Sequence, residues 1–387
     1  MNRQTFSVVT KPIGPKCNLD CQYCFYLKKE LMFEQPSHLM NDDMLEVWVQ
    51  SYIESQVALG NHQINFIWQG GEPTLCGLDY FHKIVTLQQK HKPQNPNIQI
   101  ENAVQTNGVL ITEDWAKFLK EHNFLVGLSI DGNKEMHDAY RKDKRGKGSY
   151  DLVVNGLENL QKYDVAVNAL CVVNSLNAQQ PKQVYRHLVN TLGFRFIQFI
   201  PCVEPIRQGK NINVTPWTVR PKLWGQFLSE VCKEWYGANH VQQVYIQLFD
   251  LQVGYKFGLE SSLCLFKQDC GDALALEHNG DLYACDHFVD DEWRLGNIAK
   301  ENLSDLAFSS KQTEFGKMKS GTLPRCCHSC PYLTRCWGEC PKNRFVPDAK
   351  SPNPKAYLCE GWKYFFKNTD DIFKDIAAEY ARTHGLG

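Results

Sequence analysis

The sequence lacks any apolar run long enough to cross a membrane, and its charges almost cancel. Its 387 residues include 42 Lys or Arg and 43 Asp or Glu, a formal net charge of −1. A membrane-spanning helix needs about 20 consecutive apolar residues, and a basic excess is typical of proteins that bind nucleic acid or anionic membranes. We therefore expect neither membrane nor nucleic acid among its partners. The absence of repeats and low-complexity segments argues against a solenoid or a disordered tail.

The first residues, 1–6, also lack the apolar core of a secretory signal peptide, so we expect a cytoplasmic protein. Its sixteen cysteines then need an explanation, because a reducing compartment does not keep structural disulfides. Nine of them lie between Cys264 and Cys359, and clustering of this kind indicates metal. If the metal is in iron-sulfur clusters, which decay in oxygen, an anaerobic or microaerobic setting follows.

Short apolar segments alternate with helical patterns up to about residue 203, as in βα units with a parallel sheet. The predicted strands are residues 7–11, 64–69, 98–105, 124–129, 165–173 and 196–200. The predicted helices are residues 40–59, 78–91, 113–121, 149–163 and 181–192. Six such units without a seventh or eighth strand predict an α/β fold with a partial (β/α)6 TIM-like barrel. Ligands in such folds gather where the strands end.

The later part of the chain predicts a second, cysteine-rich domain. We expect the barrel over residues 1–235, a bridging helical segment over 236–260 and the cysteine-rich domain over 261–387. Helices are predicted over 223–235 and 244–258, a strand pair over 273–278 and 282–284, and a final helix over 362–382. Asn279-Gly280 is a typical turn between the paired strands.

Cys17, Cys21 and Cys24 form a C-x3-C-x2-C pattern. Three thiolates hold three irons of a cubic four-iron cluster, which leaves the fourth iron open for another ligand. A zinc site or scattered buried cysteines are the alternatives, but zinc needs a fourth ligand that the following residues do not supply. The pattern therefore favours an iron-sulfur cluster with an open iron.

A second set of cysteines is larger. Cys327, Cys330, Cys336 and Cys340 read C-x2-C-x5-C-x3-C, with Cys359 after them and Cys264, Cys270 and Cys285 before them. Eight thiolates complete two four-cysteine clusters. A pair of zinc ribbons is the alternative, because it uses similar short knuckles.

The residues around the first triplet, 16–26, resemble the signature of radical S-adenosylmethionine (SAM) enzymes. Gly70-Gly71-Glu72-Pro73, which alone would be an ordinary turn, resembles the GGE motif of that superfamily. The resemblance implies that SAM chelates the open iron. It also implies SAM contacts from Tyr23 and Val203 to adenine, Gly71 to the ammonium group, Ser129 to the ribose and Arg141 to the carboxylate. The rest of the basic run 141–147 is more typical of a solvated loop.

The cysteine-rich part resembles the SPASM domain of radical SAM enzymes that modify peptides. The resemblance implies interleaved ligation of two [4Fe-4S] clusters, and hence three clusters in the whole chain. One set is Cys264, Cys270, Cys285 and Cys340, and the other is Cys327, Cys330, Cys336 and Cys359. Cys326 could replace its neighbour, although only Cys327 gives the two-residue knuckle with Cys330.

Nearly the full length resembles the anaerobic sulfatase-maturating enzymes, including residues 105–108, 128–132 and 293–298. The resemblance implies oxidation of a Cys or Ser to Cα-formylglycine, through a 5′-deoxyadenosyl radical that removes a Cβ hydrogen. It makes Asp286 the general base, with His287 as the second choice. The implied partners are an unfolded sulfatase polypeptide and an electron donor such as flavodoxin or ferredoxin.

Three alternatives remain at this point. Another SPASM maturase would make thioether or carbon-carbon crosslinks instead of an aldehyde. An electron carrier with several clusters or a zinc-stabilised binding module would need neither the Gly-Gly-Glu-Pro loop nor Ser129 and Arg141 at strand ends.

Overall fold

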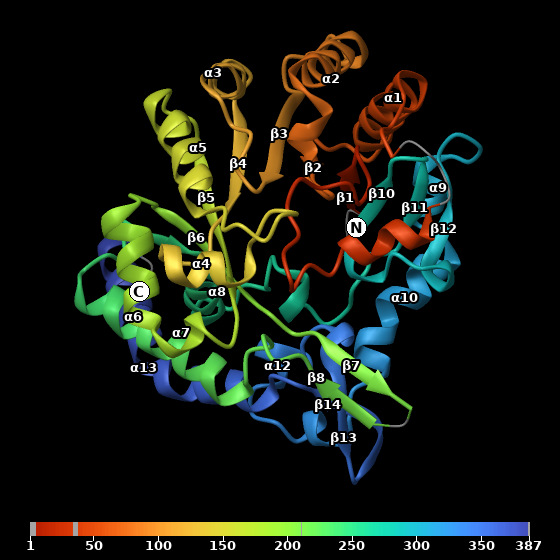
Figure 1. The fold of residues 1–387 in the computed structure, drawn as a ribbon. Helices are drawn as coiled ribbons and strands as arrows, with labels where there is room; N and C mark the ends of the chain where they lie inside the picture. The colour runs from red at the N-terminus through yellow and green to blue at the C-terminus, as the bar shows by residue number, and fades with distance from the viewer. Residues whose placement is uncertain (1–4, 34–37, 210, 386–387) are drawn as a thin grey trace. The chain divides into compact units, whose positions relative to one another are not determined.

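The computed structural model describes residues 5–33, 38–209 and 211–385, so residues 1–4 of the segment that we tested for a signal peptide lie outside it. The chain divides into two compact units (Figure 1). Unit 1 comprises residues 1–129, 140–167 and 271–316, and unit 2 comprises 130–139, 168–270 and 317–387. These units do not follow the segments 1–235, 236–260 and 261–387, which stay a prediction of domain organisation.

Unit 1 is an α/β layer built on a mostly parallel sheet, with strand order β12-β11-β10-β1-β2-β3-β4. Its strands are β1 (Ser7–Lys11), β2 (Gln63–Trp68), β3 (Gln99–Thr106), β4 (Phe124–Ser129), β10 (Ala273–Glu277), β11 (Asp281–Tyr283) and β12 (Arg294–Asn297). Its helices are α1 (Asp42–Ala58), α2 (Leu78–His91), α3 (Glu113–Glu121), α5 (Tyr150–Lys162) and α9 (Leu303–Ala307). Helices α1, α2, α3 and α5 follow one another along one side of β1–β4 (Figure 1).

Local sequence explains why these elements begin and end where they do. The Asn41 side chain accepts a hydrogen bond from the Met44 N–H at 2.8 Å, and Thr112 accepts one from the Trp115 N–H at 3.4 Å. Such N-caps satisfy backbone donors that the first helical turn leaves free. Inward residues of β2 alternate with exposed ones and are buried against α1 and α2. The predicted bounds of β1, β4, α2 and α3 are confirmed.

Strand β10 extends this sheet on the outer edge of β1. It pairs in parallel with β1, from Ser7 opposite Ala273 to Lys11 opposite Glu277. β11 and β12 then add antiparallel strands. The sequence predicted the β10–β11 hairpin but gave it no partner, because a pairing between distant segments leaves no local pattern. The register brings the ends of β1 and β10 together.

Unit 2 contains, apart from single terminal residues, a three-stranded parallel sheet, two hairpins and most of the remaining helices. Its parallel strands are β5 (Val167–Val173), β6 (Phe196–Pro201) and β9 (Tyr245–Ile246). Its hairpins pair β7 (Pro205–Gln208) with β8 (Asn211–Val214), and β13 (Arg344–Asp348) with β14 (Ser351–Ala356). Its helices are α4 (Lys134–Tyr140), α6 (Pro181–Arg186), α7 (Pro221–Gly237), α8 (Gln247–Lys256), α11 (Arg325–His328), α12 (Leu333–Cys336) and α13 (Cys359–His384), while α10 (Ser310–Gly321) runs from unit 1 into unit 2.

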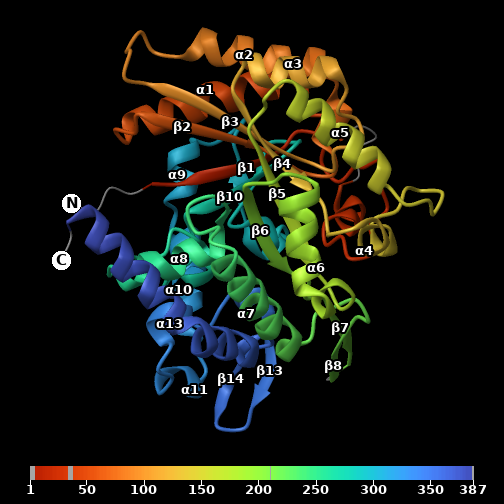
Figure 2. The same cartoon turned by 90° about the vertical axis from the view of Figure 1, so that its left-hand side faces the viewer.

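The core of unit 2 depends on the close packing of α7 against α13, which run side by side in Figures 1 and 2. A Cβ on Gly225 would lie 2.5 Å from the carbonyl oxygen of Gly361, so the two helices need glycine at their crossing. Beside it the rings of Trp224 and Trp362 meet edge to face at 5.3 Å. Both indoles are fully buried.

The sequence was wrong on several shorter elements. The helix predicted over 181–192 ends as α6 at Arg186 and continues as a π-helical turn, His187–Thr191. The helix predicted over 244–258 begins at Gln247, because Tyr245 and Ile246 pair with β6. Helices α9–α12 stand where we expected strands and loops, since helices this short depend on caps and packing rather than on periodicity. Among the described residues, no helix combines the length and the apolar character needed to cross a bilayer.

Candidate active site

The first cysteine triplet lies in unit 1, in the segment between β1 and α1. The Cys17 Sγ accepts a hydrogen bond from the Leu19 N–H at 3.4 Å, and the Asn107 side-chain amide approaches it at 3.8 Å. Burial raises the pKa of the Cys17 thiol to about 11, the Leu19 bond opposes this, and neighbouring Glu72 and Cys24 add to it. Soft thiolates with N–H donors around them fit an iron-sulfur cluster, whose potential such bonds adjust.

The buried Glu72 joins the two loops beside this triplet. Its carboxylate accepts hydrogen bonds from the Thr74 N–H at 3.0 Å, the Thr106 hydroxyl at 2.7 Å and the Asn107 N–H at 2.7 Å. Asn107 in turn donates to the Asn18 side chain at 2.7 Å. Burial raises the pKa of Glu72, and these bonds oppose the rise. The loops after β2 and β3 are therefore fixed to each other and to the cysteine segment.

Gly71 lies where this loop meets the chain that leads into Cys17. Its N–H donates to the Gly14 carbonyl at 2.8 Å, and the Glu72 N–H donates to the Lys16 carbonyl at 3.0 Å. A Cβ on Gly71 would lie 2.0 Å from that Lys16 oxygen, a contact that no side chain tolerates. The glycine is needed here for close approach of two backbones.

Gly71→Ala is expected to destabilise unit 1 and weaken SAM binding, because the Lys16 backbone must move. Overpacking of this kind costs about 1–3 kcal/mol. Thermal unfolding and a SAM titration by calorimetry measure the two effects. Gly237→Ala is the matched control, since nothing lies within 4 Å of a Cβ at that position. Equal stability and SAM affinity in both variants would contradict the prediction.

The remaining residues predicted to contact SAM divide between the units. In unit 1, the Arg141 guanidinium lies 5.4 Å from the centroid of the Tyr23 ring and is nearly buried. Backbone bonds from Asp20 to Lys142 and from Gln22 to Tyr140 attach this segment to the cysteine loop. Ser129 ends β4 and is also buried. Val203 follows β6 in unit 2, where it is buried.

Asp286 lies in unit 1 beside the end of β1. Its carboxylate forms an ion pair with the Nζ of Lys11, the last residue of that strand. The Lys11 side chain is 1 % exposed and that of Asp286 is 20 % exposed, so the acid is partly accessible while its partner is enclosed. Lys11 also donates to the Gln69 side chain at 2.9 Å and lies 4.2 Å from the centroid of the Tyr26 ring.

The sequence did not predict the polar network that continues from this pair. The Tyr26 hydroxyl donates to the Glu277 carboxylate at 2.6 Å, and Gln69 donates to Gln105 at 2.5 Å. Burial, together with Glu277, raises the pKa of Tyr26 well above its usual value. A lysine at the end of an apolar strand was a signal that we did not use. A second signal was the pair Gln69 and Gln105, which directly precede the loops after β2 and β3.

Several buried cysteines of unit 2 affect one another's pKa. Burial raises the pKa of the Cys270 thiol to about 12; Lys319 opposes the rise, and Cys340 and Cys264 add to it. Burial likewise raises the pKa of Cys336 to about 12, with smaller contributions from Glu339, Cys359 and Cys327. Cys326, which is in neither predicted set, also raises the pKa of Cys327 and Cys359, so the two ligand sets stay a prediction. Cys359 and Cys330 both contribute to the raised pKa of Lys363. Cys285 belongs to unit 1, directly before Asp286.

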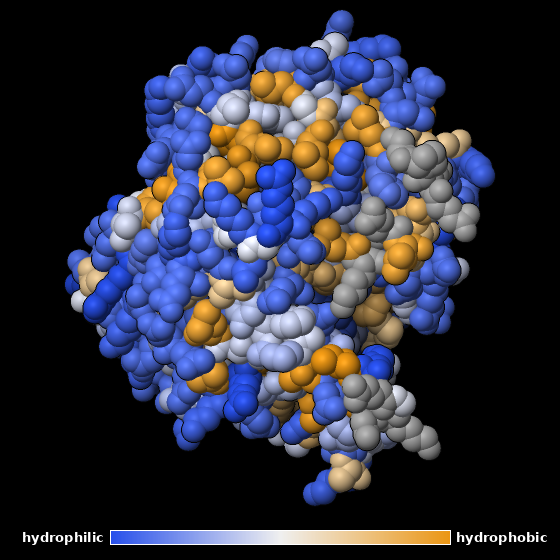
Figure 3. All heavy atoms as spheres, viewed as in Figure 1, coloured by the Kyte–Doolittle hydropathy of each residue, from blue (hydrophilic) through white to orange (hydrophobic). Residues whose placement is uncertain are grey.

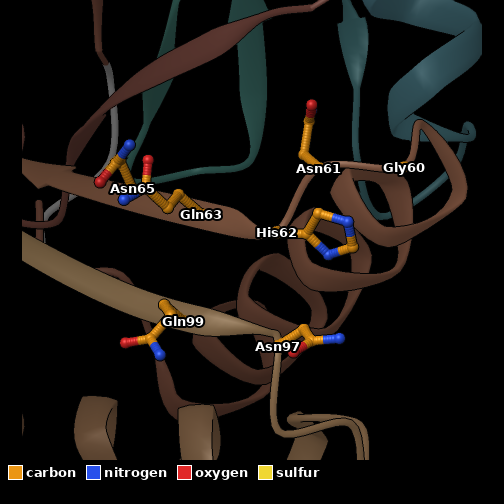
Figure 4. Close-up of a pocket in the computed structure, with 7 residues that line it drawn as sticks. All are labelled: Gly60, Asn61, His62, Gln63, Asn65, Asn97 and Gln99. Carbon is orange, nitrogen blue, oxygen red and sulfur yellow. The ribbon is translucent and has the colours of Figure 1, made fainter.

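A hollow of about 530 Å³ lies at the other end of β2 and β3 (Figure 4). It is lined mainly by amide side chains such as Asn61, Gln63, Asn97 and Gln99. These residues precede or begin the two strands, whereas the candidate site lies where the strands end. None of the predicted site residues is among those that line it.

Two family models and several known proteins match this chain. The Radical SAM superfamily matches residues 12–188, and an iron-sulfur cluster-binding domain, SPASM, matches residues 269–331. A serine-type anaerobic sulfatase-maturating enzyme from Bacteroides thetaiotaomicron is 39% identical over 374 residues, 93% of this chain and 88% of that protein. The chain belongs to the anaerobic sulfatase-maturating enzymes. These are radical SAM oxidoreductases that convert a Cys or Ser into formylglycine, which confirms the predicted family and enzyme class.

Other relatives of this sulfatase-maturating enzyme include both substrate types. A cysteine-type enzyme from Clostridium perfringens is 36% identical over 93% of this chain and 95% of that protein. The solved structure "Native anSMEcpe with bound AdoMet" matches with a TM-score of 0.86 at 35% identity, over 96% of this chain and 99% of that one. It confirms the fold class, an α/β radical SAM fold with a parallel central sheet. The Streptococcus suis protein SuiB shares the fold alone, at 14% identity and a TM-score of 0.59.

Proposed function

We propose that this sulfatase-maturating enzyme uses Asp286 as the general base when it oxidises the Cβ of a Cys or Ser in an unfolded sulfatase polypeptide. The observation that carries the proposal is the ion pair of a mostly buried, partly accessible Asp286 with the enclosed Lys11. A base needs an accessible carboxylate in one fixed orientation. Lys11 supplies the orientation, because Gln69 and the Tyr26 ring hold its ammonium group in place.

Cys17, Cys21 and Cys24 would hold the open cluster, and Tyr23, Gly71, Ser129, Arg141 and Val203 would bind SAM. When bound, SAM on the reduced cluster supplies the radical that removes the Cβ hydrogen. The chain's own contribution is position: Glu72 fixes the two loops around the cysteine segment, and Arg141 presents a guanidinium of the geometry that pairs with a carboxylate.

Asp286 would take the Sγ or Oγ proton of the target residue, so that a C=S or C=O bond can form at Cβ. Removal of one hydrogen atom and one proton leaves one electron to be accepted. The two C-terminal cysteine sets would hold the clusters that accept it. With a cysteine target, water then replaces sulfur and releases sulfide, and with a serine target the aldehyde forms directly.

Exposed apolar side chains commonly mark sites that bind a polypeptide. The segment after the third cysteine offers such side chains, because Phe25, Leu31 and Met32 expose 41 %, 91 % and 36 % of their surface. Phe25 also meets the His287 ring at 5.2 Å, which connects this segment to the residue after Asp286. Figure 3 shows apolar side chains among hydrophilic ones on the face that it draws. The similar solved structure "Native anSMEcpe with bound AdoMet and Cp18Cys peptide" is one of a protein with a bound peptide.

We infer a reducing, cytoplasmic setting and an external electron donor such as flavodoxin or ferredoxin. Sixteen cysteines, none of them in a disulfide among the described residues, fit that setting. The open cluster must be reduced before it can act on SAM, so the proposed function needs such a donor.

Mass spectrometry of a sulfatase-derived peptide, offered once with Cys and once with Ser at the target position, tests the proposal. We expect at least one peptide to yield an aldehyde that a hydrazide probe captures. A peptide with Ala at the target is the control. The runner-up function, thioether or carbon-carbon crosslinking, predicts instead a peptide two hydrogens lighter with no capture by hydrazide. SAM cleavage without any aldehyde from either peptide would overturn the proposal.

A further inference from the structure

Unit 2 encloses two cations that the mechanism above does not use. Lys319, near the end of α10, has no exposed surface. Its Nζ donates to the carbonyl oxygens of Cys264 at 2.7 Å and Leu265 at 2.9 Å. A fully buried ammonium is costly unless opposite charge lies near it. Among the described residues, no carboxylate forms an ion pair with Lys319.

Arg344, the first residue of β13, is the second cation. Its guanidinium donates to the carbonyls of Gly338 at 2.9 Å, Lys319 at 2.7 Å and Trp337 at 2.7 Å, and to that of Glu339 at 3.2 Å. The side chain is 8 % exposed. It too forms no ion pair with a carboxylate in the part of the chain that the structure describes. Neutral oxygens accept from its donors, namely these carbonyls and the Thr322 hydroxyl at 3.3 Å, so no carboxylate binds the guanidinium directly.

The loop that Arg344 holds connects the two predicted cysteine sets. Trp337, Gly338 and Glu339 separate Cys336 from Cys340, and all three have positive φ angles, 45°, 68° and 61°. Left-handed backbone is unfavourable for Trp and Glu, so a strong clamp is needed to keep it. Arg344 supplies the clamp by binding the carbonyl of each of these three residues.

The charges of the two cations reach the thiols of both sets. Burial lowers the pKa of Lys319, and the thiols of Cys270, Cys264 and Cys340 oppose this. Burial lowers the pKa of Arg344, and thiols of both sets oppose this. They are Cys327 and Cys336 of one set and Cys270 and Cys340 of the other. The acid beside them is Glu339, which receives a bond from Asn343 at 2.8 Å and whose pKa burial raises to about 7. It offsets at most one of the two cations.

A four-iron cluster with four thiolates carries net negative charge, and a fixed cation beside it favours the reduced form. We propose that Lys319 and Arg344 are the buried counter-charges that raise the reduction potentials of the two C-terminal clusters. Lys319 acts on the cluster of Cys264, Cys270 and Cys340, and Arg344 acts on both. Both are positioning residues. The inference rests on the proposed function where it takes these clusters as electron acceptors.

The test is a potentiometric titration of the auxiliary clusters followed by electron paramagnetic resonance, without SAM or peptide. Cys17, Cys21 and Cys24 are replaced by Ala in every variant, so that only the two C-terminal clusters give a signal. Lys319→Gln is expected to make one cluster at least tenfold harder to reduce, about 59 mV for one electron. Lys317→Gln, an exposed charge on the same helix, is the control and should leave both potentials unchanged.

Arg344→Gln is expected to lower both potentials, and Arg344→Lys to restore most of the loss because it keeps the charge. Iron and sulfide content shows whether each variant holds its clusters. If Lys319→Gln and Arg344→Gln lose them, Lys319→Arg and Arg344→Lys decide, since a charge role requires near wild-type potentials in both. Unchanged potentials in loaded Gln variants, or a full shift in Arg344→Lys, would overturn the proposal.

Aldehyde formation separates this inference from the function beneath it. When the Gln substitutions are made in the enzyme with its first cluster intact, we expect a lower ratio of aldehyde to cleaved SAM. Shifted potentials with an unchanged ratio would keep the counter-charge role and remove the clusters as electron acceptors. The reduction potentials therefore test the counter-charge role, and the ratio of aldehyde to cleaved SAM tests the clusters as electron acceptors.

Discussion

Asp286→Asn is expected to lower aldehyde formation by about 10²- to 10⁴-fold, the usual contribution of a positioned base. Asn has nearly the same shape as Asp but cannot take the proton from the target Sγ or Oγ. Iron content and SAM cleavage should stay close to wild type, so the ratio of aldehyde to 5′-deoxyadenosine falls. Mass spectrometry of the peptide and chromatography of the nucleoside give that ratio.

Asp291→Asn is the matched control, because it removes an exposed carboxylate five residues further on and should change nothing. Lys11 variants separate orientation from proton transfer. Lys11→Met removes the ion partner of Asp286 and should lower the ratio, while Lys11→Arg keeps a cation and should recover part of it. An unchanged aldehyde yield in Asp286→Asn would mean that another group, such as His287, takes the proton.

Replacing Cys17, Cys21 and Cys24 together by Ala should reduce SAM cleavage to background. The open cluster loses all its protein ligands, while the thiols of unit 2 are untouched. About eight of twelve iron atoms should therefore remain, as expected for two four-iron clusters. Iron and sulfide analysis, with release of 5′-deoxyadenosine under anaerobic reduction, measures both effects.

Cys76→Ala serves as the control for this substitution, because that thiol belongs to none of the predicted sets. It should retain all three clusters and normal cleavage. Surviving cleavage in the triple variant would show that the radical begins elsewhere. Loss of all iron would show instead that the N-terminal triplet is needed for the fold of unit 2.

Features that local pattern determines could be predicted from the sequence. Asn41 and Thr112 marked helix starts because capping is a matter of three neighbouring residues. Cysteine spacing identified the candidate ligands for the same reason. The contact of Lys11 with Asp286 could not be read in this way, since it depends on the pairing of β1 with β10 across most of the chain.

The loop between Cys336 and Cys340 shows a second limit. Gly338 is an ordinary left-handed residue, but Trp337 and Glu339 adopt that conformation because Arg344 binds their carbonyls. No propensity of Trp or Glu predicts it. The counter-charges followed only from three-dimensional placement, because in the sequence Lys319 is one more lysine of a polar segment.

The pairing of β1 with β10 has a consequence for how the protein is made. Ser7 pairs with Ala273, which is 266 residues later in the chain (273 − 7), so β1 can pair with β10 only after that residue has been made. At about 5–20 residues per second, the ribosome needs roughly 13–53 s to reach that point. Throughout this interval β1 has a bare edge, and the nascent cysteine loop beyond Lys11 is unprotected. Asp286 follows β10 in the chain, so its carboxylate can reach Lys11 only after the strand that pairs with β1 has been made.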